Sequence, residues 1–305
     1  MTQPFSHVAI IGLGLLGSSI AHAVRAHLPQ ASLSGWDSDA QVRARARELA
    51  LADAIPDVAA DAVRGAELVI FCVPVGAMAQ AAAAVAPGLA DGVLISDVGS
   101  SKRTVANALE AALPGRTIIP AHPVAGTEHS GPDAGFASLF HGRWCIVTPP
   151  EGCDAALLAR LIAFWEALGA RVEVMDADHH DLVLAVTSHL PHLIAYTIVG
   201  TASDLEEVTR SEVIKYSAGG FRDFTRIAAS DPIMWRDVFL SNRDAVLEML
   251  QRFTEDLTEL QKAIRKGDGD ALFDHFVRTR AIRRSIIEEG QDDARPDFGR
   301  KHNGD

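Results

Sequence analysis

The sequence of 305 residues has few cysteines and no long apolar run, and both absences narrow the classes of protein to which it can belong. Cys72, Cys145 and Cys153 are too few for a disulfide framework and lack the spacing of a metal knuckle. No stretch of about 18 apolar residues indicates a membrane span. The alanine-rich segment 77–90 comes nearest, but Pro87 interrupts it. A disulfide scaffold, a zinc knuckle and a membrane protein are therefore not expected.

Positive charge is also scarce. The chain has 28 Lys and Arg against 40 Asp and Glu, a net charge of −12, so nothing draws it as a whole to nucleic acid or to an anionic membrane. An anionic substrate would need a local cluster of positive groups. The first apolar run starts by about His7, which leaves no room for a signal peptide before it. We expect a cytoplasmic protein with neither nucleic acid nor membrane as partner.

The stretch 8–17 is the most informative part of the chain. An apolar run ends in three glycines, Gly12, Gly14 and Gly17, spaced as G-x-G-x-x-G and followed by a helical pattern. Strand, glycine turn and helix N-terminus are the parts that bind the pyrophosphate of a dinucleotide. The alternative is an ordinary turn between a strand and a helix.

Asp37 strengthens the dinucleotide interpretation. It follows a second apolar run, about 20 residues after the last glycine, where an acid hydrogen-bonds the adenine ribose. A carboxylate there disfavours a 2′-phosphate, so we expect NAD rather than NADP, although Arg43 could soften this preference. We expect the cofactor to contact the glycine loop and the ends of later strands: Gly12, Gly14, Leu15, Leu16, Gly17, Asp37, Val73, Pro74 and Ser100.

Strand and helix patterns alternate up to about residue 178 and predict a doubly wound α/β domain over 1–178. Strands are expected at 8–11, 31–36, 67–74, 93–98, 117–121, 143–148 and 171–175, and helices at 18–26, 39–53, 77–86, 103–112 and 154–168. Residues 179–305 then read as an all-α domain. Its amphipathic runs are 179–203, 204–215, 231–265 and 269–289, and the tail from about 291 is expected to be frayed. Pro191 should kink or restart the first run, and Asp231-Pro232 should cap a helix start.

Polar residues follow several of the predicted strands, at the edge where ligands of open α/β sheets bind. His122 comes directly after the strand 117–121, where its imidazole could accept a hydroxyl proton as hydride leaves the same carbon. The alternative is a loop histidine bonded to backbone. Ser100 could bond the reacting hydroxyl, cap helix 103–112, or do both. Glu128 could orient His122, line the pocket or remain a solvated carboxylate.

The helical part offers a second set of polar residues. Ser188, His189 and His192 share one helix face, either toward a substrate or within the core. The two histidines lack the H-E-x-x-H spacing of a zinc helix and no metal is expected. Arg226, one turn after Arg222, could bind a carboxylate. The arginines could equally form an exposed face with Asp223 as ion-pair partner, and Trp235 could line a pocket or fill the core.

Five motifs in order closely resemble the prephenate/arogenate dehydrogenase family of tyrosine biosynthesis over roughly residues 7–285. They are the loop 12–18, Asp97-x-Gly-Ser100, His122-Pro-x-Ala-Gly-Thr-Glu128, Ser188-His-Leu-Pro-His192 and Gly220-Phe-x-Asp-x-Thr-Arg226-Ile-Ala. The resemblance implies a Rossmann-type domain and a C-terminal all-α substrate-binding and dimerisation domain. It also implies oxidation of the C4 hydroxyl of prephenate or arogenate by NAD+ with loss of CO2, and a homodimer.

The resemblance also assigns roles to residues. His122 matches the acceptor of the C4-hydroxyl proton, and Ser100 matches a serine bonded to hydroxyl, histidine and nicotinamide. Arg226 matches an arginine that binds a substrate carboxylate. Glu128 matches a gate or pocket carboxylate, and Asp223 matches a supporting partner of the arginine cluster. Ser188, His189 and His192 match the helical wall of the pocket, and Trp235 belongs to a further block familiar from the family.

Two other interpretations remain open. A related two-domain β-hydroxyacid dehydrogenase would use a lysine on the first long interdomain helix, where this chain has only Ser188, His189 and His192 as candidates. A non-catalytic NAD sensor would not need a proton acceptor such as His122 beside the nicotinamide.

Overall fold

The computed structural model describes residues 3–127, 129–204, 215 and 219–288. Contacts along the chain define two compact units, Met1–Leu247 and Glu248–Asp305. The first unit contains every strand of the described chain and includes both sides of the boundary predicted near residue 178. That boundary stays a prediction.

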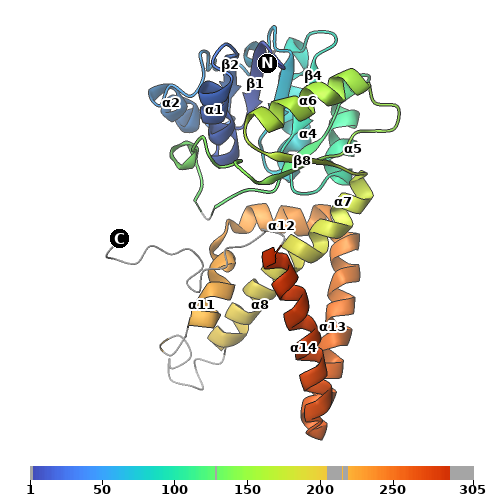
Figure 1. The fold of residues 1–305 in the computed structure, drawn as a ribbon. Coiled ribbons are helices and arrows are strands. Elements are labelled where there is room, and N and C mark those ends of the chain that lie inside the picture. The colour runs from blue at the N-terminus through green and yellow to red at the C-terminus, as the bar shows by residue number, and fades with distance from the viewer. Residues whose placement is uncertain (1–2, 128, 205–214, 216–218, 289–305) are drawn as a thin grey trace. The chain divides into compact units, whose positions relative to one another are not determined.

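A parallel sheet of five strands forms the centre of the first unit (Figure 1). Its order is β2-β1-β3-β4-β5, so the chain reverses its direction of winding between β1 and β3. The carboxyl ends beside such a reversal are where open α/β sheets bind ligands. The strands are β1 (His7–Ile11), β2 (Ser32–Trp36), β3 (Leu68–Phe71), β4 (Leu94–Asp97) and β5 (Thr117–Ile118).

Helices cover both faces of this sheet, which confirms the predicted doubly wound domain. Alternate residues of β1 point to opposite faces, so Val8 and Ile10 join one apolar cluster while Ala9 and Ile11 join the other. The helices around the five strands are α1 (Leu15–His27), α2 (Ala40–Glu48), α3 (Ala59–Ala62), α4 (Met78–Val85) and α5 (Arg103–Ala112). Helix α2 is shorter than the predicted 39–53, and α3 was not predicted.

The strand predicted over 117–121 is wrong in one respect, because the structure divides it between two sheets. Pro120 lacks an N–H group and cannot continue the ladder of β5. The chain crosses into a three-stranded sheet of order β6-β7-β8, in which β6 and β7 are antiparallel. Its elements are β6 (Ala121–Pro123), β7 (Trp144–Val147) and β8 (Arg171–Val174), with α6 (Ala155–Ala167) between the last two. His122 therefore lies on a strand, not in a loop.

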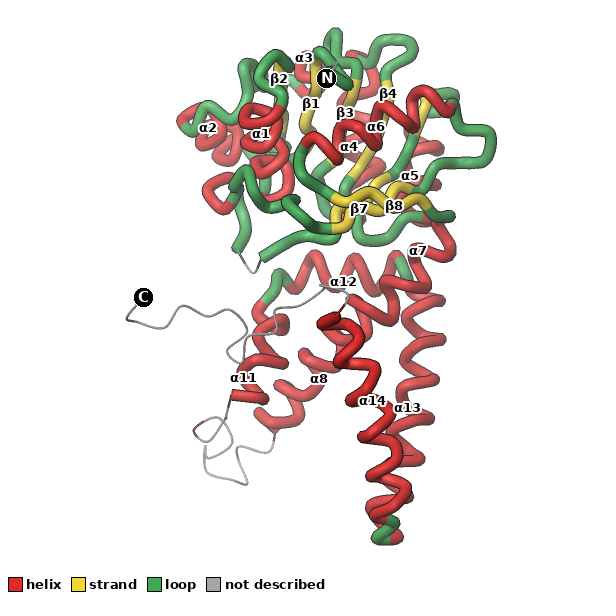
Figure 2. Tube along the Cα trace, in the orientation of Figure 1, coloured by secondary structure: helices red, strands yellow, loops and turns green. Residues whose placement is uncertain are grey.

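Every described element after β8 is helical (Figure 2). The first run combines α7 (Ala177–Leu184), a π-helical turn (Ala185–His189) and α8 (Leu190–Asp204). Pro191 cannot donate the usual i→i−4 hydrogen bond, and the wider π turn directly before it absorbs the defect. The helix continues through Pro191 after this turn, so the expected restart does not occur, and the expected kink stays a prediction.

By length and composition this run of 28 residues, Ala177–Asp204, could cross a membrane, because it contains an 18-residue window with a mean hydropathy of 1.6. No such run was expected from the sequence. Core helices of soluble proteins can have the same length and composition. In the described structure 28% of this window is buried, and the buried Asp181 and His189 of the run hydrogen-bond residues elsewhere in the first unit.

The remaining helices of the first unit are α11 (Gly219–Thr225) and α12 (Pro232–Ser241), joined through a 3-10 turn (Arg226–Ala229). Asp231 caps α12 by accepting a hydrogen bond of 2.8 Å from the Met234 N–H, as predicted. The predicted helix 231–265 is broken at Asn242. Almost all of the predicted run 204–215 and the tail from 291 lie outside the described residues.

The second unit contains most of α13 (Arg243–Lys266) and all of α14 (Gly269–Glu288). Gly267, with a φ of 68°, makes the turn between them. Large apolar side chains are exposed on both helices: Leu257, Ile264, Phe273, Phe276, Val277 and Ile282.

Candidate functional site

The glycine loop lies where β1 meets β3. Gly12 has a φ of 98°, and a Cβ at this residue would come 2.5 Å from the Cys72 carbonyl oxygen at the end of β3. A Cβ at Gly17 would come 1.9 Å from the Gly12 carbonyl oxygen, so α1 packs directly on the turn. A Cβ at Gly14, in contrast, would meet nothing within 4 Å. The space in front of Gly14 is open to a ligand that approaches the backbone.

Helix α1 begins beside this open space. Its N-cap Gly14 offers no side-chain hydrogen bond, and its first turn, which includes Leu15 and Leu16, has no acidic residue. The N–H groups and the positive end of the helix dipole are therefore available to an anion. These features fit the pyrophosphate of a dinucleotide, and Val73, which follows β3, lies against Gly12.

Asp37 lies at the end of β2 and touches the same loop. Its carboxylate accepts hydrogen bonds from the N–H groups of Leu13 at 2.9 Å and Asp39 at 3.0 Å. Arg43 donates to the Asp37 carbonyl at 2.9 Å and to Asp57 at 3.3 Å. Arg43 is thus held beside the Asp37 backbone, and a carboxylate occupies the position predicted to read the adenine ribose.

His122 is fixed through its neighbour Ala121. The Ala121 N–H donates to Asp97 at 3.3 Å, and its carbonyl accepts from Lys102 at 2.7 Å. Lys102 and Asp97 form an ion pair with no exposed side-chain surface. Backbone held on both sides by a buried ion pair has little freedom, so the strand β6 presents His122 in one position.

The second ring of the site belongs to His180 on α7. The Nδ1 atom of His122 lies 2.8 Å from Nε2 of His180, and Nδ1 of His180 lies 2.8 Å from a carboxylate oxygen of Asp181. Burial, followed by His180, Lys102 and His189, lowers the pKa of His122 well below its usual value. His122 is therefore neutral at physiological pH, as a general base must be.

Asp181 has a second role as the cap of α5. This helix has no local side-chain cap, and the carboxylate of Asp181 accepts from the N–H groups of Lys102 at 2.7 Å and Arg103 at 3.0 Å. The cap thus comes from α7, far along the chain. Ser100 does not cap α5, and this part of its prediction is wrong.

His189 contributes a hydrogen-bond donor. The Asn242 amide nitrogen donates to the Asp181 carbonyl at 2.7 Å and faces Nδ1 of His189 at 3.1 Å, so that Nδ1 accepts and Nε2 carries the proton. This Nε2 is buried and has no hydrogen-bond partner. Burial lowers the pKa of His189 to about 4, while Asp181 and the nearby Ser100 carbonyl act in the opposite direction. His189 is therefore neutral and aims an N–H toward the Ser100 segment.

His192 stacks on Trp235 with ring centroids 3.6 Å apart, and His189 meets the same indole edge-on at 6.1 Å. Nδ1 of His192 donates to the Ser188 carbonyl at 2.8 Å. Burial lowers the pKa of His192, the hydrogen bond to the Ser188 carbonyl raises it, and the charge of Arg226 lowers it.

The structure therefore brings together most of the predicted pocket. His122 contacts His180, His189 lies near Ser100, and Trp235 bridges the two histidines that were expected to line a substrate site. Asp223 lies on α11, one turn before Arg226. Pro74 is exposed directly after β3 and Val73. Glu128 lies outside the described residues.

Four polar residues have a part in the site that was not expected from the sequence: Lys102, His180, Asp181 and Asn242. All four are buried. A signal existed for the middle two, because the adjacent His180-Asp181 pair stands immediately before a long apolar helical run, where a buried polar pair needs partners. Among the described residues no group of three His, Cys, Asp or Glu side chains is arranged to bind a metal.

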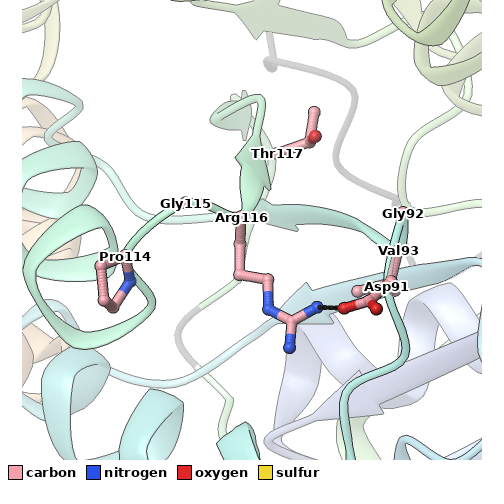
Figure 3. A pocket seen from close by; sticks show the side chains of 7 residues that line it. All are labelled: Asp91, Gly92, Val93, Pro114, Gly115, Arg116 and Thr117. Atoms are coloured by element: carbon pink, nitrogen blue, oxygen red, sulfur yellow. Dashed lines mark hydrogen bonds and ion pairs between the residues drawn. The ribbon is translucent and has the colours of Figure 1, made fainter.

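A hollow of about 410 Å³ lies elsewhere, lined by 91–93 and 114–117 (Figure 3). These residues lie before β4 and at the start of β5, so the hollow is at the amino ends of the strands, opposite the glycine loop. Arg116 points across it to Asp91, at 3.1 Å, and also donates to the Ala90 carbonyl. The guanidinium thus braces a loop, and the hollow is separate from the candidate site.

Comparison with known proteins supports a single family. Residues 20–174 match the nucleotide-binding domain of prephenate dehydrogenase, and residues 176–278 match its dimerization domain. A cyclohexadienyl dehydrogenase from Zymomonas mobilis is 48% identical over 92% of this chain and 96% of its own length. A prephenate dehydrogenase from Bacillus subtilis is 32% identical over 93% of this chain and 76% of its own length.

A solved structure agrees with these matches. The crystal structure of prephenate dehydrogenase from Aquifex aeolicus, in complex with hydroxyphenyl propionate and NAD+, superposes with a TM-score of 0.86 at 32% identity and covers 92% of this chain and 98% of its own. The likeness spans both the strands and the helical segment. This chain belongs to the prephenate dehydrogenase family.

Proposed function

We propose that this protein oxidises prephenate with NAD+ and releases CO2, giving 4-hydroxyphenylpyruvate for tyrosine biosynthesis. The membership of the family supports the reaction, and the observation that supports its chemistry here is the neutral, buried His122 beside the carboxyl ends of the strands. Bound NAD+ would accept a hydride from C4 of the substrate. His122 takes the C4-hydroxyl proton through Nε2, since its Nδ1 faces His180.

The cofactor site fits this reaction. The open space at Gly14 and the uncapped start of α1 suit the pyrophosphate, and the Asp37 carboxylate suits the adenine ribose. Val73, Pro74 and Ser100, which follow β3 and β4, would flank the nicotinamide end.

The substrate carries two carboxylates, and the helical segment offers cationic and hydrogen-bonding groups for them. Arg226 supplies a permanent positive charge beside His192, and Asp223 would support Arg226. The stacked pair of His192 and Trp235 offers a flat apolar wall to the ring. The pocket would be completed by Ser188, His189 and Glu128.

Aromatisation makes the loss of CO2 favourable, so the protein has only to align hydride donor, proton acceptor and carboxylates. The proton that His122 holds can return to the phenolate oxygen that CO2 loss creates. The balance of the reaction then requires no metal and no further reactant.

The organisation of the chain follows from the same family. We propose a nucleotide-binding domain over 1–178 and a helical substrate-binding domain over 179–305 that pairs two copies into a homodimer. A dimerization-domain match and the exposed apolar side chains of α13 and α14 support the pairing. A small-molecule biosynthetic reaction of this kind belongs in the cytoplasm. A β-hydroxyacid dehydrogenase is set aside by the family assignment.

The test is NADH formation by the purified protein with NAD+ and, separately, prephenate and arogenate. Turnover with prephenate is expected, and the ratio of the two kcat/KM values shows whether the amino acid analogue is also used. A folded protein that binds NADH but turns over neither acid would contradict the proposal and favour the sensor interpretation.

A further inference from the structure

The hydrogen bonds around His122 determine where its proton resides. They begin at Asp181, whose carboxylate oxygens are hydrogen-bond acceptors only. One oxygen accepts from Lys102 N–H and lies 2.8 Å from Nδ1 of His180, while the other accepts from Arg103 N–H. Nδ1 of His180 must therefore carry a proton.

The proton on Nδ1 of His180 also determines where the proton of His122 lies. A neutral His180 with its proton on Nδ1 has a lone pair on Nε2, and this atom lies 2.8 Å from Nδ1 of His122. Nδ1 of His122 must then be the donor. The proton of neutral His122 is on Nδ1, and its Nε2 is left with the lone pair that a general base needs.

We propose that His180 and Asp181 are positioning residues that hold His122 in the tautomer whose Nε2 accepts the substrate proton. The inference rests on the proposed function for the identity of that proton. Without the pair, neutral His122 would distribute its proton between both ring nitrogens, and in one of these forms Nε2 could not act as a base.

The same hydrogen bonds also stabilise the protonated form of His122 that the reaction produces. When the O–H bond of the substrate breaks and an N–H bond forms at Nε2, both nitrogens of His122 carry hydrogen. Nδ1 still donates to His180, and the negative charge of Asp181 lies one ring away. A buried carboxylate oriented in this way stabilises an imidazolium without itself taking the proton.

Two substitutions of His180 by side chains of similar size show whether it acts by accepting the hydrogen bond from His122 or only by filling space. His180→Gln can still accept a hydrogen bond from His122 Nδ1 through its amide oxygen, whereas His180→Leu cannot. Asp181 keeps its bonds to Lys102 and Arg103 in both variants. We expect His180→Leu to lower kcat by about 100-fold and His180→Gln by less than about 10-fold, with KM for both substrates within about 3-fold of wild type.

A double-mutant cycle tests whether His180 acts through His122. In a His122→Asn background, His180→Leu should lower the residual kcat by less than about 3-fold, because residues that act as a unit are strongly non-additive. The matched control is Asp178→Asn, which removes the exposed ion pair of α7 with Arg103 and leaves the hydrogen bonds that join Asp181, His180 and His122 intact. It should retain wild-type kcat. Equal losses in the Leu and Gln variants, or additive losses in the cycle, would overturn the proposal.

Nitrogen-15 NMR of labelled histidine measures the tautomer directly and needs neither substrate nor turnover. The chain has 12 histidines, and the signals of His122 are those lost in His122→Asn. Wild-type protein should show a protonated Nδ1 and a bare Nε2 at His122, and His180→Leu should show a mixture. A mixture or the opposite tautomer in the wild type would overturn the inference even if prephenate is turned over. The expected spectrum without turnover would instead contradict the proposed function alone.

Discussion

At the scale of single residues, the proposed chemistry depends on one nitrogen atom, Nε2 of His122. Asparagine in place of His122 can present an N–H to His180 in the position of Nδ1, but it has no base in the position of Nε2. We expect His122→Asn to lower kcat by about 1,000-fold while the dissociation constant of NADH changes by less than about 3-fold. Stopped-flow or steady-state NADH formation and a fluorescence titration measure the two quantities.

The exposed His27 at the end of α1 provides a control, and His27→Asn should match the wild type in both measurements. If His122→Asn kept a tenth or more of the wild-type kcat at an unchanged pH optimum, another group would have to accept the proton.

Asp37 determines the expected preference for NAD+ over NADP+. Its carboxylate would repel a 2′-phosphate, and in Asp37→Ser the neighbouring Arg43 would face that phosphate instead. We expect the ratio of kcat/KM for NADP+ to that for NAD+ to rise at least about 10-fold. Asp39→Ser is the matched control, since Asp39 caps α2 and serine caps equally well. Unchanged NAD+ preference in Asp37→Ser would mean that other groups select the cofactor.

The residues found from the sequence and those missed differ in a physical way. Gly12, Asp37, His122 and His192 stand in short local patterns. Asp181 acts on Lys102 across 79 positions, and no spacing rule relates two residues that meet only after folding. The long-range cap and the tautomer of His122 required coordinates.

At the scale of elements, two glycines in the turn between β1 and α1 are expected to have different roles. Gly17 allows α1 to pack on the turn, and Gly14 leaves space for the cofactor. In Gly17→Ala the new methyl would collide with the Gly12 carbonyl oxygen, and α1 would have to move off the sheet. In Gly14→Ala the methyl would enter open space. We expect Gly17→Ala to lower the free energy of unfolding by about 3 kcal/mol, and Gly14→Ala to leave it within about 0.5 kcal/mol.

For cofactor binding we expect the opposite: Gly14→Ala, rather than Gly17→Ala, should act directly. Gly14→Ala should weaken NADH binding at least about 10-fold in a fully folded protein, because its methyl occupies the path of the pyrophosphate. Thermal melting without cofactor and an NADH titration distinguish the two variants. A Gly14→Ala protein that binds NADH normally would show that the dinucleotide does not approach this part of the loop.

Most elements of the fold could be predicted because their apolar periods are long and their ends carry glycine, proline or a capping acid. The misjudged elements have another cause. The apolar run through Pro120 looks like one strand, but a missing N–H group ends the ladder, and the next sheet begins within three residues. Likewise, Asn242 breaks a continuous amphipathic pattern, since its amide bonds Asp181 and His189.

At the scale of the whole molecule, the exposed apolar residues of the last two helices predict association. We expect light scattering to give twice the chain mass of 32.5 kDa. Phe276, which is 56% exposed on α14, should be part of the buried surface of the dimer, and Phe276→Asp should shift the mass toward one chain at micromolar concentration. Val58→Asp, at an equally exposed apolar residue near α3, should remain dimeric. A wild-type mass of one chain would contradict the proposed homodimer.

The cap that Asp181 places on α5 also has a consequence in time. Chains are synthesised at about 5–20 residues per second, so Asp181 emerges roughly 4–16 s after Lys102, from which it is separated by 79 positions. During this interval the glycine loop and α1 are already available, whereas α5 has no cap and His122 has no partner to orient it. Under the proposed function, a growing chain would thus have its cofactor loop before its base is oriented, and the order of translation would place binding ahead of chemistry.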